Sequence, residues 1–232
     1  MSLLLGIDEG TSAVKAVVYD EDLRQLGEGR REKALQHPKP GWVEQDPEEI
    51  LEAVAGAAAD AMSEAPGEVV ACGLDHQGES VLAWDAETGR PITPVVTWQD
   101  KRSQEILDGL EADGRAETVK KRSGMPLDPY FSAGKLAWLL QNDDAVAAAR
   151  DAGSLRLGTV DSFLCDRLGA GFATDVSTAS RTQLATPGEP DWDDELLEIF
   201  GVPKEALPAI EDTAGDLGVC LLYTSPSPRD RS

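Results

Sequence analysis

Short apolar runs, separated by residues that favour turns, fill the first third of the chain and predict β-strands. The strands expected there cover residues 3–8, 14–20 and 25–34. Further strands are expected at residues 69–75, 80–85, 95–98 and 155–158, and the first of these reads as a buried strand.

Apolar residues recur with helical spacing between residues 50 and 62, which predicts a helix. We expect Asp46 to cap it, Pro47 to occupy its first position and Glu49 to complete a capping box. Further helices are expected at residues 102–110, 116–122, 132–140, 145–152, 160–168 and 193–200. Strands followed by a mixture of helices and strands indicate an α/β domain with a mixed central sheet.

The composition is that of a soluble globular protein, with 232 residues of which 41% are hydrophobic and 28% charged. The apolar runs are too short to span a bilayer, and the first lacks the basic residues of a signal peptide. Cys72, Cys165 and Cys220 are too far apart for a disulfide framework or a metal site, so we expect a reducing, cytoplasmic setting. We expect Cys72 and Cys165 to be inert core residues, and His76 to be a packed or hydrogen-bonded residue at a strand end.

The 43 acidic residues outnumber the 21 basic ones and give a formal net charge of −22. Such a surface repels nucleic acid and anionic membranes, so neither is expected as a partner. It also repels nucleotides at long range. A nucleotide site on this chain would therefore need local hydrogen-bond donors and a metal ion.

The turn between the first two expected strands carries the clearest candidate chemistry. The backbone N–H groups and two hydroxyls of Gly10, Thr11 and Ser12 can surround a phosphate, and Gly10 lets it approach because it has no Cβ. Asp8, at the end of the preceding strand, can hold Mg²⁺ directly or through water. Lys15 adds a positive charge nearby. The alternative is an ordinary hairpin with an exposed acid.

Several ordered blocks of sequence resemble one enzyme family. The turn itself belongs to a DEGTS block at residues 8–12, and a PKPGWVEQDP block follows at 38–47. The other blocks are GLDHQGES at 73–80, VTWQDKR at 96–102, DPYFS at 128–132, GTVD at 158–161, ASRT at 179–182 and DWDD at 191–194. In this order they are similar to the FGGY family of carbohydrate kinases, above all the glycerol kinases, from about residue 4 to 217.

This resemblance implies a ribonuclease H-like domain of the actin, hexokinase and heat-shock chaperone superfamily, in which two such domains close over ATP and substrate. Residues 1–219 would be the N-terminal domain of a kinase that transfers the γ-phosphate of MgATP to a hydroxyl of glycerol or a related polyol or sugar. Residues 220–232 change abruptly in composition and resemble translated adapter sequence. We expect them to be a non-native disordered tail, with a natural disordered tail as the alternative.

On the nucleotide side, the resemblance assigns Thr11 and Ser12 to the phosphates of ATP and Asp8 to Mg²⁺. Ala13 stands where the glycerol kinases have Ser, so only its backbone N–H can contribute. Lys15 replaces the family's Arg, and it keeps the positive charge but loses the bidentate fork.

On the substrate side, the resemblance assigns Glu79 as the acceptor of polyol hydroxyls, Tyr130 as a donor to them and Trp98 as the ring against the carbon skeleton. Carboxylate, phenol and indole together suit a molecule with hydroxyls on one side and C–H groups on the other. Each alone has an ordinary alternative, namely a solvated acid, a turn residue and a core aromatic.

Gly78 departs from the family, in which an Arg precedes the matching Glu. A charged donor to a terminal hydroxyl is therefore missing, which costs about 1.5–3 kcal/mol. Either another residue replaces that donor, or the substrate is a bulkier polyol or sugar than glycerol.

No residue of this chain is assigned as the catalytic base. In the family an Asp in a GxxDQ-type block has that role, and no such block occurs before residue 219. We therefore expect the chain itself to be inactive and its full-length parent to be a kinase, with a homo-oligomer of that parent left open. The alternatives are a regulatory ATP- and polyol-binding member of the superfamily and a degenerate kinase without activity.

Overall fold

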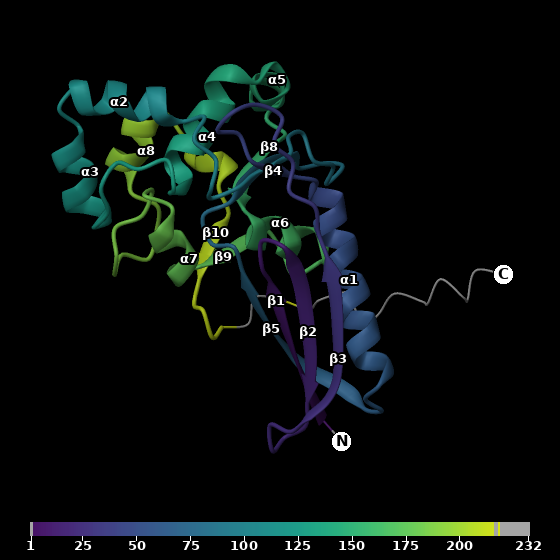
Figure 1. Cartoon of the computed structure of the whole chain (residues 1–232). Coiled ribbons are helices and arrows are strands. Elements are labelled where there is room, and N and C mark those ends of the chain that lie inside the picture. Colours follow the sequence, from purple (N-terminus) through teal and green to yellow (C-terminus); the bar gives the residue numbers. More distant parts are fainter. Residues whose placement is uncertain (1, 216–217, 219–232) are drawn as a thin grey trace.

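The computed structural model describes residues 2–215 and residue 218, and most of the strands lie in two four-stranded sheets (Figure 1). The first sheet has the strand order β3-β2-β1-β5. It is built from β1 (Ser2–Glu9), β2 (Ala13–Tyr19), β3 (Gln25–Glu32) and β5 (Glu68–His76). Because β1 is antiparallel to β2 and parallel to β5, this sheet is mixed, which confirms the predicted class.

The second sheet has the strand order β4-β7-β6-β8, and its pairs are antiparallel. It is built from β4 (Glu44–Gln45), β7 (Val95–Val96), β6 (Val81–Asp85) and β8 (Leu155–Thr159). Two further short strands, β9 (Ala173–Asp175) and β10 (Ala209–Glu211), form a parallel pair.

Helices surround the second sheet, while one long helix runs along the first sheet (Figure 1). The long helix is α1 (Pro47–Ser63). The others are α2 (Gln104–Ala112), α3 (Ala116–Ser123), α4 (Ser132–Asn142), α5 (Asp144–Ala152), α6 (Val160–Arg167), α7 (Val176–Arg181) and α8 (Asp194–Phe200), followed by a 3-10 turn at Lys204–Ala206.

The close contact between α1 and β3 depends on small residues. Ala57 and Ala61 are fully buried on the helix. A Cβ added to Gly27 would lie 2.1 Å from the carbonyl oxygen of Ala61, and one added to Gly29 would lie 2.0 Å from that of Ala57. Both distances are far below van der Waals contact, so the helix can approach this strand only because these two residues are glycine.

Two hydrophobic cores stabilise the chain. One lies between α1 and the first sheet and extends to Trp84 and Phe163, whose ring centroids are 5.5 Å apart in an edge-to-face arrangement. The other lies between the second sheet and the helices above it, with Leu136, Leu196 and Phe200 among its buried side chains. The sequence pattern of apolar runs therefore supplies the inner faces of both sheets.

Each expected strand and helix is present, with ends that differ by about two residues at most. The sequence did not indicate β4, β9, β10 or α7, all of which have six residues or fewer. Such short elements carry too few residues for a periodic pattern, and contacts with neighbouring segments decide their conformation.

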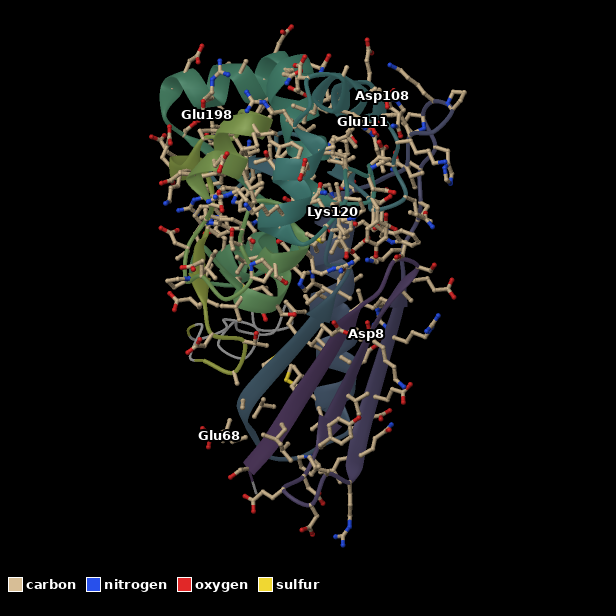
Figure 2. All side chains as sticks on the ribbon, turned by 90° about the vertical axis from the view of Figure 1, so that its left-hand side faces the viewer. Asp8, Glu68, Asp108, Glu111, Lys120 and Glu198 are labelled. Atoms are coloured by element: carbon tan, nitrogen blue, oxygen red, sulfur yellow. The ribbon has the colours of Figure 1, made fainter. Side chains whose placement is uncertain are left out.

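The strand expected at residues 69–75 is present, but the prediction that it is buried is wrong. β5 lies at the edge of its sheet (Figure 2), and Val70 on this strand is 58% exposed. Cys72 on the same strand is exposed and Cys165 is half-buried, so the prediction that both are core residues is also wrong. The physical reason is position, because α1 covers only the other side of the sheet and packs mainly on β2 and β3.

The N-terminus of α1 confirms the predicted cap but not the capping box. The Asp46 side chain accepts a hydrogen bond from the backbone N–H of Glu48 at 2.9 Å. Glu49 does not reach back to Asp46, and its carboxylate instead accepts a bond from the backbone N–H of Ala34 at 3.2 Å. A contact across the fold thus replaces the local one.

Within residues 2–215 and 218, no helix is long and apolar enough to cross a membrane. The tail expected at 220–232, with Cys220, lies outside the described residues. The tail and the domain boundary at residue 219 therefore stay predictions.

We expect Gly29→Ala to destabilise the chain by about 1–3 kcal/mol, because the added methyl group overlaps the Ala57 carbonyl and forces α1 away. Urea unfolding measures the change. The matched control is Gly109→Ala on the exposed surface of α2, where an added Cβ meets open space. It should stabilise the helix by about 0.5–1 kcal/mol, and equal midpoints for the two variants would contradict the packing argument.

Candidate active site

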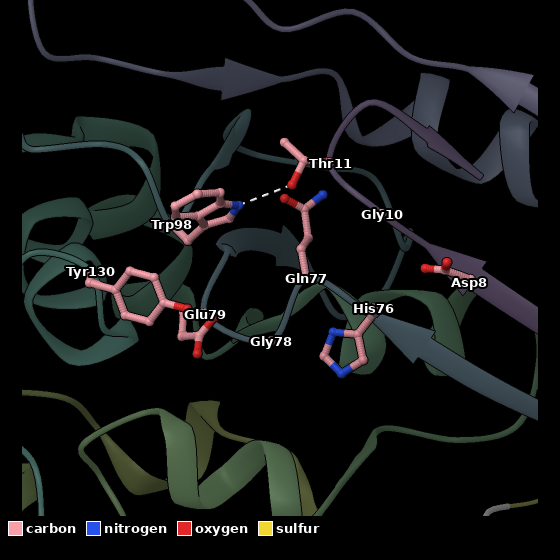
Figure 3. Close-up of a pocket in the computed structure, with 9 residues that line it drawn as sticks. All are labelled: Asp8, Gly10, Thr11, His76, Gln77, Gly78, Glu79, Trp98 and Tyr130. Atoms are coloured by element: carbon pink, nitrogen blue, oxygen red, sulfur yellow. Dashed lines mark hydrogen bonds between the residues drawn. The ribbon is translucent and has the colours of Figure 1, made fainter. Parts of the chain in front are cut away.

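A cavity of about 240 Å³ opens at the end of the first sheet, where the parallel strands β1 and β5 finish (Figure 3). Strand ends of this kind bring residues from distant parts of a chain to one edge of a sheet. The lining residues are Asp8, Gly10, Thr11, His76, Gln77, Gly78, Glu79, Trp98 and Tyr130. Four separate stretches of sequence therefore meet in one cavity.

The turn between β1 and β2 is held by contacts from three other segments. The backbone N–H of Lys33 donates to the carbonyl oxygen of Ser12 at 2.9 Å. The Gln45 side chain donates to the carbonyl oxygen of Thr11 at 2.8 Å, and the Trp98 indole N–H donates to the Thr11 hydroxyl at 3.0 Å. The Thr11 hydroxyl is therefore an acceptor on one side and keeps its own proton to donate.

A buried polar network lies beneath this turn. The side chains of Glu9 and Lys33 are fully buried and form an ion pair. The Gln77 amide group donates to Glu9 at 3.0 Å and to Gln45 at 2.8 Å, and its oxygen accepts a bond from Ser80 at 2.8 Å. The network thus connects the ends of β1, β3, β4 and β5, and a satisfied network of this kind fixes their relative positions.

Glu9 and Lys33 were not singled out from the sequence, although a signal existed for Glu9. On β1 the buried side chains alternate as Leu3, Leu5 and Ile7, which puts Glu9 on the inner face. On β3 the buried positions are 27 and 29, but Arg31 is exposed, so the alternation ends before Lys33. Extending the period of two would have found Glu9, whereas only the tertiary structure shows that Lys33 is buried with it.

Aromatic rings and a carboxylate form the other wall of the cavity. The Trp98 and Tyr130 rings meet edge to face, with centroids 5.7 Å apart. Glu79 is buried, and its Oε1 accepts bonds from Nε and Nη2 of Arg181 at 2.8 and 2.7 Å. Partial burial opposes the charge of Arg181, but hydrogen bonds to Glu79 outweigh it and raise the pKa of the guanidinium.

The segment that carries Trp98 is anchored by an arginine between two indoles. Arg102 lies 3.8 Å from the Trp42 ring centroid and 5.0 Å from that of Trp138. The same guanidinium pairs with Asp100 and Glu44 at 2.8 and 2.6 Å. Arg102 belongs to the VTWQDKR block, and Trp42 and Glu44 belong to the PKPGWVEQDP block. The stack therefore gives both blocks a structural role, because it joins the two segments to each other.

The loop that carries Tyr130 is held from below by a buried lysine. Nζ of Lys135 donates to the carbonyl oxygens of Pro129, Tyr130 and Phe131 at 3.0, 2.6 and 2.7 Å. Its side chain is among the largest fully buried ones in the chain. Burial lowers the pKa of Lys135 to about 7, against the opposing effect of the nearby Glu79 charge.

The structure brings most of the sequence-predicted site residues together. Those that line the cavity are Asp8, Gly10, Thr11, Gly78, Glu79, Trp98 and Tyr130. Ser12 is exposed beside the cavity and Ala13 is half-buried at the start of β2. Lys15 does not line the cavity, and its Nζ pairs instead with Glu28 on β3 at 3.4 Å.

His76 and Gln77 also line the cavity and were not predicted as site residues. Nε2 of His76 is 3.0 Å from the Thr178 hydroxyl, as expected for a hydrogen-bonded residue at a strand end. Glu79 and Arg181 are 102 residues apart in sequence. Their contact depends on α7, a helix that the sequence pattern did not indicate.

With this geometry in view, the chain can be compared with known proteins. The N-terminal domain of the FGGY family of carbohydrate kinases matches residues 3–225. A glycerol kinase of Rhizobium meliloti (strain 1021) is 42% identical over 229 residues, which cover 97% of this chain and 45% of that protein. The ribonuclease H-like α/β fold and the family follow together: this chain belongs to the FGGY family of carbohydrate kinases.

Solved structures agree with that assignment. Glycerol kinase of Plasmodium falciparum with ADP superposes with a TM-score of 0.88 and 29% identity, over 95% of this chain and 45% of that one. Gluconate kinase of Lactobacillus acidophilus has a TM-score of 0.82 and 27% identity, over 90% of this chain and 42% of that one. The chain therefore spans about half the length of the relatives it matches.

The Lys135 contact predicts a specific pH dependence of stability. Between pH 7 and 10.5 the unfolded chain binds more protons at this lysine than the folded chain does, so its contribution to folding becomes more favourable as the pH rises. Lys135→Met removes this effect and leaves three carbonyls without a donor. We expect the wild type to exceed this variant in unfolding free energy by an amount that grows from pH 7 to pH 10.

Urea unfolding at several pH values measures that difference. Lys121→Met, at an exposed position on α3, is the matched control and should differ from the wild type by a constant amount. If the unfolding free energies of the wild type and Lys135→Met differ by the same amount at every pH, burial does not lower the pKa of Lys135 as described.

Proposed function

We propose that this chain is the N-terminal half of an ATP-dependent carbohydrate kinase that transfers the γ-phosphate of ATP to a hydroxyl of glycerol or a related polyol or sugar. The observation that carries the proposal is the hydrogen bond from the Trp98 indole to the Thr11 hydroxyl, 3.0 Å long. It joins the turn suited to phosphate and the wall suited to a polyol within one cavity. Phosphoryl transfer needs donor and acceptor side by side, because its catalysis is mainly positioning and charge stabilisation.

The turn fits a nucleotide phosphate on two observations. Gly10 lines the cavity, and an added Cβ would fit there at ordinary contact distances, 3.4 Å from the Ala13 carbonyl oxygen and 3.7 Å from Asp8, so glycine leaves that space to a ligand. The Thr11 hydroxyl keeps its proton to donate, and backbone N–H groups at residues 11–13 add further donors. Lys15 would add little net charge to this turn, because its ammonium group pairs with Glu28.

Asp8 would be the carboxylate that this chain contributes to a bound Mg²⁺ ion. Among residues 2–215 and 218, no group of three or more His, Cys, Asp or Glu side chains could hold a metal ion. Mg²⁺ usually takes one or two carboxylates and fills its other positions with water and phosphate oxygens, so a single exposed Asp in the cavity suits it. When bound, MgATP supplies the phosphoryl group and the cation that stabilises its charge.

The acceptor would lie between Trp98, Tyr130 and Glu79. The Glu79 carboxylate accepts hydrogen bonds from substrate hydroxyls, the Tyr130 phenol donates to them, and the Trp98 ring covers the carbon skeleton. Gly78 leaves open space in this wall, because an added Cβ there meets no atom within 4 Å. That space favours a substrate larger than glycerol unless another donor reaches it.

The catalytic base would come from the part of the parent enzyme beyond this chain. A purified 232-residue chain with ATP, Mg²⁺ and a panel of polyols should therefore release no ADP, while the longer protein from the same gene should release ADP with at least one polyol or sugar. Coupled ADP assays measure both. Polyol-dependent turnover by the chain alone would contradict the half-site, and a longer protein that binds ATP and polyol without turnover would favour the regulatory or degenerate alternative.

Trp98→Phe tests the contact between the two halves of the cavity. The variant keeps an aromatic ring but removes the donor to Thr11, so we expect kcat/KM of the longer protein to fall about 3- to 10-fold for both ATP and the polyol. Trp192→Phe, which removes an indole hydrogen bond to the Pro208 carbonyl oxygen outside the cavity, is the control and should leave both values unchanged. An equal fall in kcat/KM for the two variants would mean that the hydrogen bond between Trp98 and Thr11 does not contribute to catalysis.

A further inference from the structure

One arginine outside the cavity lining contacts two of the proposed substrate residues. Arg181, the last residue of α7, holds Oε1 of Glu79 with two bonds, at 2.8 and 2.7 Å. Its guanidinium also lies over the Tyr130 ring, 5.9 Å from the ring centre. The neighbouring Phe131 ring is 5.4 Å away.

The two partners differ in their exposure. The Glu79 side chain is 9% exposed, whereas that of Arg181 is 45% exposed. A carboxylate this buried needs a hydrogen-bonding partner, because leaving a buried polar group unpaired is costly. A guanidinium that donates twice to a single oxygen holds that oxygen in place and leaves the second oxygen for another donor.

On the proposed function, that second donor is a substrate hydroxyl. We propose that Arg181 is a positioning residue, which holds Oε1 of Glu79 so that Oε2 accepts a hydroxyl of the polyol while Tyr130 donates to another. The position makes α7 part of the acceptor site without contact between Arg181 and the substrate, since Arg181 does not line the cavity. Under this proposal, no other guanidinium replaces the missing Arg at position 78 inside the cavity. The fixed orientation of the Glu79 carboxylate compensates for the lost donor.

The test is acceptor kinetics of the longer protein with Arg181→Gln. Because Arg181 acts on a group that binds the acceptor, KM for the polyol should rise about 10- to 100-fold, the range for a lost hydrogen bond to a charged group. KM for ATP should stay constant and kcat should change less than about 3-fold. Arg181→Lys, which keeps the charge but not the double contact, should give an intermediate KM.

Arg122→Gln is the matched control. Arg122 is 40% exposed and also pairs with a buried carboxylate, that of Asp193, at 2.7 to 2.9 Å, although it contacts both carboxylate oxygens, and it does not line the cavity. Both substitutions should lower the unfolding temperature by a similar amount, and only Arg181→Gln should change KM for the polyol. A merely structural role of Arg181 predicts equal behaviour of the two variants.

A double-mutant cycle with Glu79→Gln decides whether Arg181 acts through Glu79. In the Glu79→Gln background, adding Arg181→Gln should change the polyol KM by less than about 3-fold. An undiminished effect in that background, or an unchanged KM in the single variant, overturns the inference while the kinase assignment stands. A wild-type longer protein that phosphorylates no polyol or sugar overturns the proposed function and this inference with it.

Discussion

The buried network of Glu9, Lys33 and Gln77 is the constraint on which the rest of the site depends. Two opposite charges without solvent contact are stable only when each has its partner and the remaining polar atoms are also satisfied. Gln77 meets this demand by bonding to Glu9 and Gln45 at once, and Gln45 then holds Thr11. The strands that end at the cavity cannot shift independently, because any shift would leave a buried charge or amide unpaired.

The same principle explains how a chain with a net charge of −22 keeps positive charge near a proposed nucleotide site. Each cation near the cavity has a fixed partner: Lys33 has Glu9, Lys135 has three carbonyls and Arg181 has Glu79. These cations organise the walls of the cavity instead of attracting a nucleotide from solution. Capture of a nucleotide would then depend on short-range donors in the turn after β1 and on a metal ion, as the charge balance predicts.

The errors in the sequence interpretation share one origin, which is that burial depends on what covers an element. The run at 69–75 looks like a buried strand, yet β5 is an edge strand with an open face and Cys72 is exposed on it. Glu49 has the spacing of a capping box, yet its carboxylate accepts a hydrogen bond from a backbone N–H of another segment. Arg181 stood in a recognised block, but its contact with Glu79 depends on a short helix that sequence periodicity does not reveal.

The sequence alone determined the longer elements, the mixed sheet and the family, because strand and helix periods are local and the ordered motif blocks are specific. It also named most of the residues that line the cavity, since turn chemistry and side-chain type restrict where phosphate and polyol groups can bind. Only the tertiary structure decided which side chains are in contact: the bond between Trp98 and Thr11, the bond from Lys135 to the Tyr130 carbonyl and the pairing of Glu79 with Arg181. These contacts join residues up to 102 positions apart, and side-chain type and spacing do not encode which distant partner satisfies a buried polar group.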